Sequence, residues 1–534
     1  MKLIKIHSFL LVLATYAANT ASAQLFIDNS AQFTIQSGAI VTVQGDVTSN
    51  TDILGTGLLQ MKGAALQNIN MNGFTIPNLE IDNTSNVTLT GNTKVGTSLI
   101  FTNGKVLLGT NNLTLADVAT VSGAGTSKFV ETNGSGQVIK LLTANITSSE
   151  IPVGVGTTYR PAFITTTGTY SAANVGVRAF AVVNPNKPPM ISDYIAAYWP
   201  VTRTGVTGIV NVSGQYSNGD ISGTETNLRG YFFNGTDWSS TGEAHDAALN
   251  RVTAPIIGAS GEIFGMDKFI VLKTKVFLQA AYNTSTGVMA DNLRTPSNLI
   301  PLSDPYRTAT YSTAFPHVAN SITESANASV FADQASTNNN IVDWVFLELR
   351  NATVSPGNTV LQTRSALLKR DGNIVDVDGV SPVTFNNIAN ATYTVAIRHR
   401  IHLGISADPA TNTKALSEAK STASVLDLTT ATDAQIYGTS AAFLVATDGK
   451  NVLWAGNANG NGLTNYSALG NDRLYLLNTV LSGSTSGSVS GYSAGDLNMN
   501  RIANYSALGN DRLFLLNTVL SGSTITTKTQ ALPN

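Results

Sequence analysis

The feature that most constrains the fold is a run of very short strands between Gln24 and about residue 145. A three-residue unit, apolar-x-apolar, recurs there and is followed each time by a Gly or Asn turn. Examples of the apolar pairs are Phe33 and Ile35, Val41 and Val43, Leu79 and Ile81, Val87 and Leu89, and Leu113 and Leu115. Because side chains alternate along a strand, each pair forms one narrow apolar edge. Such edges are buried only when strands stack, so residues 24–145 predict a parallel β-helix or similar solenoid, with a short-stranded sandwich as the alternative.

Length and composition favour a mainly β protein of several domains. A chain of 534 residues is too long for one hydrophobic core and should divide into about three or four domains. It contains no cysteine, so its stability depends on burial, strand pairing and any bound metal. Charged residues make up only 12% of the chain, and Asn, Thr, Ser and Gly are abundant, as is typical of strands joined by polar turns.

The first 23 residues are typical of a secretory signal peptide. Lys2 and Lys5 precede an apolar stretch over residues 9–18, and the small residues Ala-Ser-Ala at 21–23 suit cleavage. No later segment is long and apolar enough to span a bilayer. Without Lys2 and Lys5 the 31 basic residues become 29 against 33 acidic, a net charge near −4 that indicates neither nucleic acid nor an anionic membrane as partner. We expect a protein that is secreted or held at the outer cell surface.

Residues 146–272 predict an antiparallel β-sandwich. The segments are longer here, aromatic residues are more frequent, and turn signals stand about ten residues apart. Trp199 and Trp238 have two interpretations. Their ring faces could stack on sugars, or they could anchor the core, which is the more frequent role of large aromatic residues.

Residues 273–455 predict a second β-sandwich with a connecting segment. In VDWVFLELR, residues 342–350, apolar side chains stand on both faces of one strand, and we expect Asp343 and Arg350 to form an exposed ion pair of little energetic value. Together with RDGNIVDVDG at 370–379 and VAIRHRIHLG at 395–404, this string resembles a sandwich module of large surface proteins and haemagglutinin-like proteins of Gram-negative bacteria. The chain departs from the family pattern at Ile401, where Asn is usual. The resemblance implies a cell-surface location.

Two polar groups in this module invite a metal interpretation. The first offers oxygen ligands for a hard cation, but its Asp-Gly pairs are strong hairpin-turn signals, and turns alone explain these residues. Its members are Asp371, Asn373, Asp376 and Asp378. The second is the pair His399 and His402, which we expect to point to opposite faces because the two residues are three apart on a strand.

Catalytic patterns are not recognisable in the sequence. No G-x-S-x-G elbow is present, and the histidines lack the third ligand and general base that a zinc enzyme needs. Carboxylate pairs for glycoside cleavage form in space, and nothing in the sequence singles one out. We therefore predict a protein that is not an enzyme.

Residues 456–534 contain an internal duplication. The segment NYSALGNDRLYLLNTVLSGST at 465–485 recurs at 504–524 with one change, Tyr475 to Phe514. Each copy follows a loop with an oxygen-bearing side chain at every second residue, as calcium loops have, because their tight turns direct alternate side chains to one ion. These loop residues are Asn457, Asn459 and Asn461 in the first copy and Asp496, Asn498 and Asn500 in the second.

The two loops resemble dockerin-like tandem calcium loops, and more closely the GDxNxDG…NDRD pairs that end many of the same surface proteins. The resemblance implies that Asp472 and Asp511 are further ligands. The first loop has no acid at positions 1, 3 and 5, and Ala468 and Ala507 stand where an EF-hand has its bidentate acid. Calcium binding should therefore be weak, with a Kd on the order of millimolar. Plain Asn-rich turns before two helices are the alternative.

Leucines at helical spacing follow each loop and predict a small α-helical pair. They are Leu474, Leu477 and Leu481 in the first copy and Leu513, Leu516 and Leu520 in the second. Such stripes would pack the copies together or dock a cohesin-like partner. Our first hypothesis is an exported, non-catalytic structural or adhesive surface protein whose receptor is a glycan or a protein. The alternatives are a glycan-binding or glycan-degrading component and a scaffold subunit that docks a partner through its C-terminal duplicate.

Overall fold

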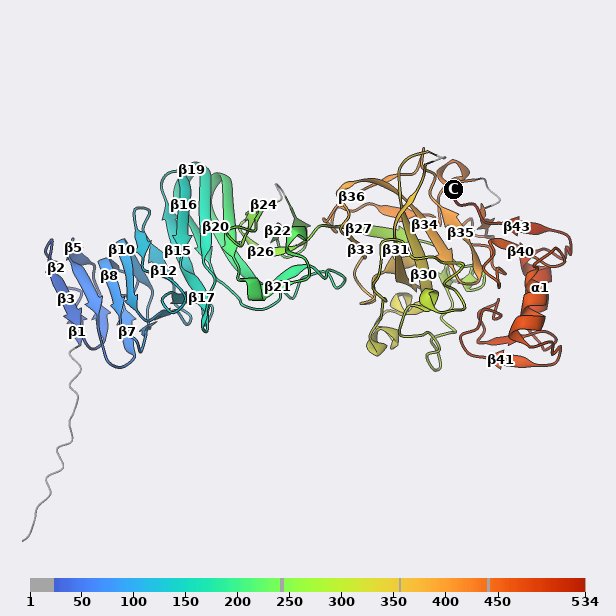
Figure 1. Ribbon diagram of the computed structural model, residues 1–534, viewed down its shortest axis with the longest axis horizontal. Coiled ribbons are helices and arrows are strands. Elements are labelled where there is room, and N and C mark those ends of the chain that lie inside the picture. The colour runs from blue at the N-terminus through green and yellow to red at the C-terminus, as the bar shows by residue number, and fades with distance from the viewer. Residues whose placement is uncertain (1–23, 241–243, 355–356, 439–441, 534) are drawn as a thin grey trace, which may run out of the picture. The chain divides into compact units, whose positions relative to one another are not determined.

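The computed structural model describes residues 24–240, 244–354, 357–438 and 442–533 (Figure 1). The predicted signal peptide, residues 1–23, lies outside this part. The protein is mainly β and divides into two compact units. Unit 1 extends to Val183 and includes Ala196–Asp220 and Ala248–Phe264, and unit 2 comprises Asn184–Ile195, Ile221–Ala247 and Gly265–Asn534. Within the described residues, no helix has the length and apolar character needed to cross a membrane.

Unit 1 contains a β-solenoid of about 6 turns, which confirms the predicted β-helix. Its strands stack side by side from β3 to β15 in Figure 1. One parallel sheet contains β3 (Ile40–Val43), β6 (Leu58–Met61), β8 (Thr75–Asp82), β10 (Thr93–Asn103), β12 (Leu113–Leu115) and β15 (Val138–Leu142). A second contains β1 (Leu25–Ile27), β4 (Val47–Ser49), β7 (Gln67–Asn70), β9 (Val87–Leu89), β11 (Val106–Leu107), β14 (Val130–Glu131) and β17 (Val153–Val155). The short pair β2 (Phe33–Ile35) and β5 (Ile53–Gly55) forms a third.

Each coil buries one face of its short strands, as the apolar pairs predict. Leu79 and Val87 are fully buried, while polar side chains that alternate with the buried ones form ladders between neighbouring coils. The Gln60 side chain donates to Glu80 at 3.0 Å, and Ser98 donates to Asn78 at 2.8 Å. At Gly104, with φ of 79°, a side chain would overlap the carbonyl oxygen of Asn83 in the previous coil. The turn therefore requires glycine.

An antiparallel hairpin follows the solenoid in unit 1. Strand β15 pairs with β19 (Ala162–Val177), which pairs in turn with β20 (Tyr194–Gln215) from Ala162 opposite Gly214 to Val177 opposite Val201. Trp199 on β20 is fully buried, and its indole N–H donates to the carbonyl of Arg160 at 2.9 Å. It is a core anchor and presents no ring face to a sugar.

Unit 2 is built on a sheet in which one interior strand is buried on both faces. Its strand order is β33 (Val383–Asn386), β27 (Phe269–Lys275), β32 (Asn373–Val375), β31 (Val360–Lys369), β30 (Ile341–Asn351), β34 (Ala391–His399) and β35 (His402–Ser406). Every residue of β30 from Ile341 to Arg350 is buried. Polar side chains of this strand must therefore find partners inside the core.

The predicted exposed ion pair between Asp343 and Arg350 is wrong, because both side chains are buried and have other partners. Arg350 contacts Glu348 at 2.6 Å and donates to the carbonyl of Pro533 at 2.7 Å. Asp343 contacts Arg400 at 3.0 Å and His399 at 3.1 Å. Strand β30 lies between β31 and β34, and its residues from Ile341 to Arg350 are buried, so both side chains lie in the core.

The expectation that His399 and His402 point to opposite faces is also wrong. Strand β34 ends at His399 and β35 begins at His402, so the chain reverses between them and the two residues pair across the hairpin. Their Nδ1 atoms lie 2.9 Å apart, and both rings are buried. The three-residue spacing belongs to a turn, where the alternation of a continuous strand does not apply.

A single arrangement of protons satisfies the two rings. The backbone N–H of Ala280 donates to Nε2 of His402 at 3.3 Å, which leaves the proton of that ring on Nδ1. That proton is donated to Nδ1 of His399, whose Nε2–H then donates to Asp343. Both histidines are neutral in this arrangement, and burial lowers the pKa of each.

Asp343 connects the sheet with the C-terminal segment. Burial by itself would raise its pKa, but the Arg400 charge and the hydrogen bond from His399 hold the pKa below its ordinary value. Its second oxygen accepts from the Tyr492 hydroxyl at 2.6 Å, and Arg400 donates to the carbonyl of Ser493 at 2.6 Å. One carboxylate thus holds together β30, the β34–β35 hairpin and the chain that leads into the second loop.

We predict that Asp343→Asn lowers the free energy of unfolding of unit 2 by about 3–5 kcal/mol, because Arg400 would stay buried without its counter-charge. Asp333→Asn is the control: this carboxylate is 86% exposed and pairs with Arg294 at 2.8 Å, so its loss should cost less than about 1 kcal/mol. Urea unfolding of the full chain, followed by tryptophan fluorescence, measures both. Equal effects would contradict a central role for Asp343.

Candidate metal centre

The duplicated segment forms two similar strand–loop–helix elements in unit 2. The first contains β40 (Leu463–Asn465), α1 (Asp472–Leu474) and the π-helical continuation η8 (Tyr475–Val480), and the second contains β42 (Ile502–Asn504), α2 (Asp511–Leu513) and η9 (Phe514–Val519). Asn471 and Asn510 cap the helices by accepting from the backbone N–H of Leu474 and Leu513, each at 2.8 Å. The short helical pair is therefore present, and strands β40 and β42 pair antiparallel with β43 (Thr527–Thr529) and β41 (Ser488–Ser490).

Asp472 and Asp511 are the first residues of the two helices, and each carboxylate accepts hydrogen bonds from backbone groups at both ends of its loop. Both are fully buried. Asp472 accepts from the backbone N–H of Ala458 at 2.8 Å and of Asn465 at 3.0 Å. In the second copy, Asp511 accepts from Leu497 at 2.7 Å and from Asn504 at 2.8 Å. The same contacts recur at an offset of 39 residues, as the repeat requires.

Burial strongly perturbs these two carboxyl groups. It raises the pKa of Asp472 to about 7 and that of Asp511 to about 7, although the backbone hydrogen bonds oppose the shift. For Asp511, the neighbouring Asp496 charge raises the pKa further, and Asp496 itself has a pKa raised by burial. A buried carboxylate of this kind takes up a proton unless a cation compensates its charge.

The predicted loop residues lie where the repeat pattern places them, and most of them shape turns. Asn459 and Asn461 accept from backbone N–H groups two residues ahead at 3.0 and 2.9 Å, and Asn498 and Asn500 do the same at 3.1 and 3.0 Å. Asp496 is fully buried and accepts from the backbone N–H of Asn500 and of Arg501, each at 2.9 Å. These oxygens keep a second lone pair, so a turn and a cation site are compatible.

Three buried amide oxygens in the loops have no hydrogen-bond partner. They belong to Asn457, Asn465 and Asn504. Asn457 is a predicted ligand, whereas Asn465 and Asn504 are not among the residues singled out from the sequence. They stand at position 9 of each loop when Asn457 and Asp496 are counted as position 1, and calcium loops use that position. Their place in the repeat was the signal that could have identified them.

The donor set fits a hard cation such as calcium. It consists of buried carboxylates and unpaired amide oxygens, and calcium takes oxygen ligands of these kinds. Within the described residues, no three His, Cys, Asp or Glu side chains form a group that could hold a metal ion. Asn and backbone oxygens would therefore have to complete the coordination. Few charged ligands per loop imply weak binding.

The two helices pack differently. Leu515, Val519 and Leu520 of the second copy join the main core of unit 2, whereas Leu476 and Leu481 of the first copy form a small cluster with Ala503 and Tyr505. The predicted leucine stripes are only partly buried, because Leu474 and Leu513 are 39% and 40% exposed. The π-helical turns change the spacing and bring Leu476 and Leu515 inward instead.

The polar groups considered in the module have hydrogen-bond and ion-pair partners within the described residues. The Asp376 side chain is buried and contacts Arg364 at 2.7 Å. Asp371 accepts from Asn373 at 3.0 Å, and Asp378 accepts from Ser381 at 2.8 Å. The hairpin-turn interpretation accounts for these side chains.

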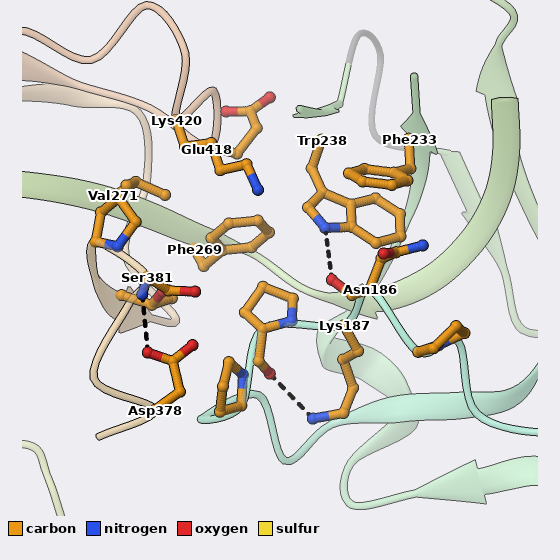
Figure 2. Close-up of a pocket in the computed structure, with 15 residues that line it drawn as sticks. Asn186, Lys187, Phe233, Trp238, Phe269, Val271, Asp378, Ser381, Glu418 and Lys420 are labelled. Atoms are coloured by element: carbon orange, nitrogen blue, oxygen red, sulfur yellow. Dashed lines mark hydrogen bonds between the residues drawn. The ribbon is translucent and has the colours of Figure 1, made fainter. Parts of the chain in front are cut away.

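Trp238 lines a cavity of about 280 Å³ in unit 2 (Figure 2). Its indole is only 5% exposed, lies against Phe233 with ring centroids 4.8 Å apart, and donates to the carbonyl of Asn186 at 3.1 Å. The side chain is therefore a core anchor. Because Trp199 is buried within unit 1, the two tryptophans do not form the sugar-stacking platform.

Comparisons with protein-family models, with curated proteins and with solved structures found no match.

We predict that, in chelator, the full chain loses stability as pH rises from about 4 to above 7. Asp511 has a pKa of about 7 when folded and about 3.9 when unfolded, so the folded state binds more protons in this window. That contribution is fully present below the unfolded pKa and is lost as pH rises through the folded pKa. Asp511→Asn should flatten the dependence, which melting temperatures across this range will measure. Identical slopes for both proteins would refute the assignment.

Millimolar calcium should raise the melting temperature of unit 2, because a ligand that binds only the folded state stabilises it by about 1.4 kcal/mol at ten times its Kd. Asp496→Ala should abolish most of the shift, since it removes a charged ligand, whereas Asn457→Ala should remove little. The measured quantity is the difference between calcium and chelator for each full-length variant. If calcium and chelator give the same melting temperature, the loops serve only as turns.

Proposed function

We propose that this chain is an exported, non-catalytic structural or adhesive protein of the outer cell surface, with C-terminal loops that bind calcium. The observation that carries the proposal is the parallel solenoid of unit 1. It presents a long regular surface made from very short strands and needs no disulfide. Such a scaffold suits a stalk or an adhesive layer. The resemblance of unit 2 to surface-protein modules supports the same location.

The calcium loops have a structural role in this proposal. The chain before the second loop is bound to the sheet through Tyr492 and Asp343, and Arg501 within that loop donates to the carbonyls of Asn292 and Thr295 at 2.7 and 2.6 Å. A cation that orders the loop would therefore also strengthen its attachment to the module. Extracellular calcium modules have Kd values of about 10⁻⁴–10⁻³ M, so loops that bind calcium weakly are sufficient for this structural role.

Export can be tested in a Gram-negative host that expresses the full chain. The expected product begins at Gln24 by mass spectrometry and is digested when intact cells are treated with protease. Ala23→Tyr should block cleavage, because signal cleavage needs small residues at this end. Retention in the cytoplasm with residues 1–23 still attached would overturn the proposal.

A scaffold subunit is the second candidate, and one observation favours it. Leu469 and Leu508 occupy equivalent positions in the two copies, and their side chains are 99% and 101% exposed. Paired exposed leucines suit a partner protein with an apolar surface.

Cross-linking on intact cells, with mass-spectrometric mapping, tests the docking role. A partner should be cross-linked to the loops at 466–470 and 505–509, and the Leu469→Ser, Leu508→Ser double variant should lose it. Ile525→Ser is the control, because this side chain is 89% exposed but lies outside the duplication. A partner that remains in the double variant would exclude these leucines as the docking surface.

A further inference from the structure

A cavity of about 620 Å³ lies in unit 2 between the module and the first copy of the repeat. Its walls come from residues 301–311, from the helical turn that carries Tyr475 and Thr479, and from residues 489–494. The volume is within the range of small-molecule binding sites. None of these residues belongs to the calcium loops.

The lining is rich in hydroxyl groups. Tyr311, Tyr475 and Tyr492 contribute aromatic rings, and the lining also includes Ser303, Thr308, Thr310, Thr479 and Ser493. The Tyr492 hydroxyl donates to Asp343, so Tyr492 contributes its ring, and not its hydroxyl, to the cavity wall. Burial raises the pKa of Tyr311 and of Tyr475, so both phenols stay protonated and can donate.

Charge is nearly absent from the cavity. Asp304 is the one ionisable acid among the described lining residues, and it is buried. It accepts from the backbone N–H of Tyr306 at 2.8 Å and lies 3.3 Å from both Arg307 and His317. No lysine or arginine is among the lining residues that the structure describes, and Arg400, whose guanidinium lies 4.1 Å from the centroid of the Tyr492 ring, is already paired with Asp343.

The duplication supplies an internal comparison. The single residue that differs between the copies, Tyr475 against Phe514, lies at this cavity in the first copy. Val480 also lines the cavity, whereas its equivalent Val519 is buried in the main core. The copy that borders the cavity therefore carries an additional hydroxyl, and the copy that fills the core does not.

We propose that this cavity binds a short neutral oligosaccharide. Sugars present many hydroxyl groups that exchange hydrogen bonds with Ser, Thr and Tyr, and their C–H faces pack on aromatic rings. The inference extends the proposed adhesive function, on which its biological role rests, by giving it a ligand class. The binding itself requires neither export nor calcium.

The test uses the full mature chain on an array of neutral and acidic glycans that includes maltotriose, cellotriose, mannotriose and chitotriose. Titration calorimetry then measures the affinity for the best neutral glycan. Tyr475→Phe should weaken binding about tenfold, because one hydrogen bond inside the site is lost. Thr479→Val should also weaken it.

Matched variants in the second copy are the controls. Phe514→Tyr and Thr518→Val make equivalent exchanges away from the cavity and should leave the affinity unchanged. Tyr475→Phe reproduces the residue that the second copy already uses, and its melting temperature will verify folding. Binding of no glycan, binding of acidic glycans only, or equal effects in both copies would overturn the inference. Protease accessibility on intact cells reports separately on the proposed surface location.

Discussion

The buried carboxylate of Asp343 is the interaction on which unit 2 depends most. It lies on a strand that is covered on both faces, and it contacts His399, Arg400 and Tyr492. Two of these residues belong to one hairpin, and the third belongs to the chain between the two repeat copies. An isolated charge at this depth would cost several kcal/mol, so the three contacts must form together. The stabilities of the sheet, the hairpin and the C-terminal segment are therefore coupled through this carboxylate.

The cost of burying an uncompensated charge also explains the properties of the repeat loops. Asp472 and Asp511 are as deeply buried as Asp343, but Asp343 has Arg400 beside it, whereas they accept mainly backbone hydrogen bonds. Their pKa values rise accordingly, and that of Asp343 falls. In the repeat loops the negative charge is left for a proton or a metal ion to compensate. This contrast is the physical basis of the calcium proposal.

The duplication has produced two copies with nearly identical sequences and different surroundings. One helix completes the main core, and the other borders the hydroxyl-lined cavity. Since 20 of the 21 repeated residues are the same, their position in the fold decides which surface each copy presents. Tyr475 in the first copy and Phe514 in the second are the one pair of equivalent residues in the repeated segment that also differ in sequence.

The sequence by itself determined the β-helix, the two helices of the tail and the location of the repeat loops. These features depend on local periodicity, because alternation along a strand and an exact internal repeat can be read without knowing what packs nearby. Tertiary structure alone decided the partners of Asp343 and the meeting of His399 with His402. Strand β30 became central only when β31 and β34 covered its two edges, and a turn of two residues reversed the geometry expected for the histidines. Burial is set by neighbours distant in sequence, so local patterns could not reveal it, and the turn between the histidines interrupts a stretch that the local pattern predicts as one continuous strand.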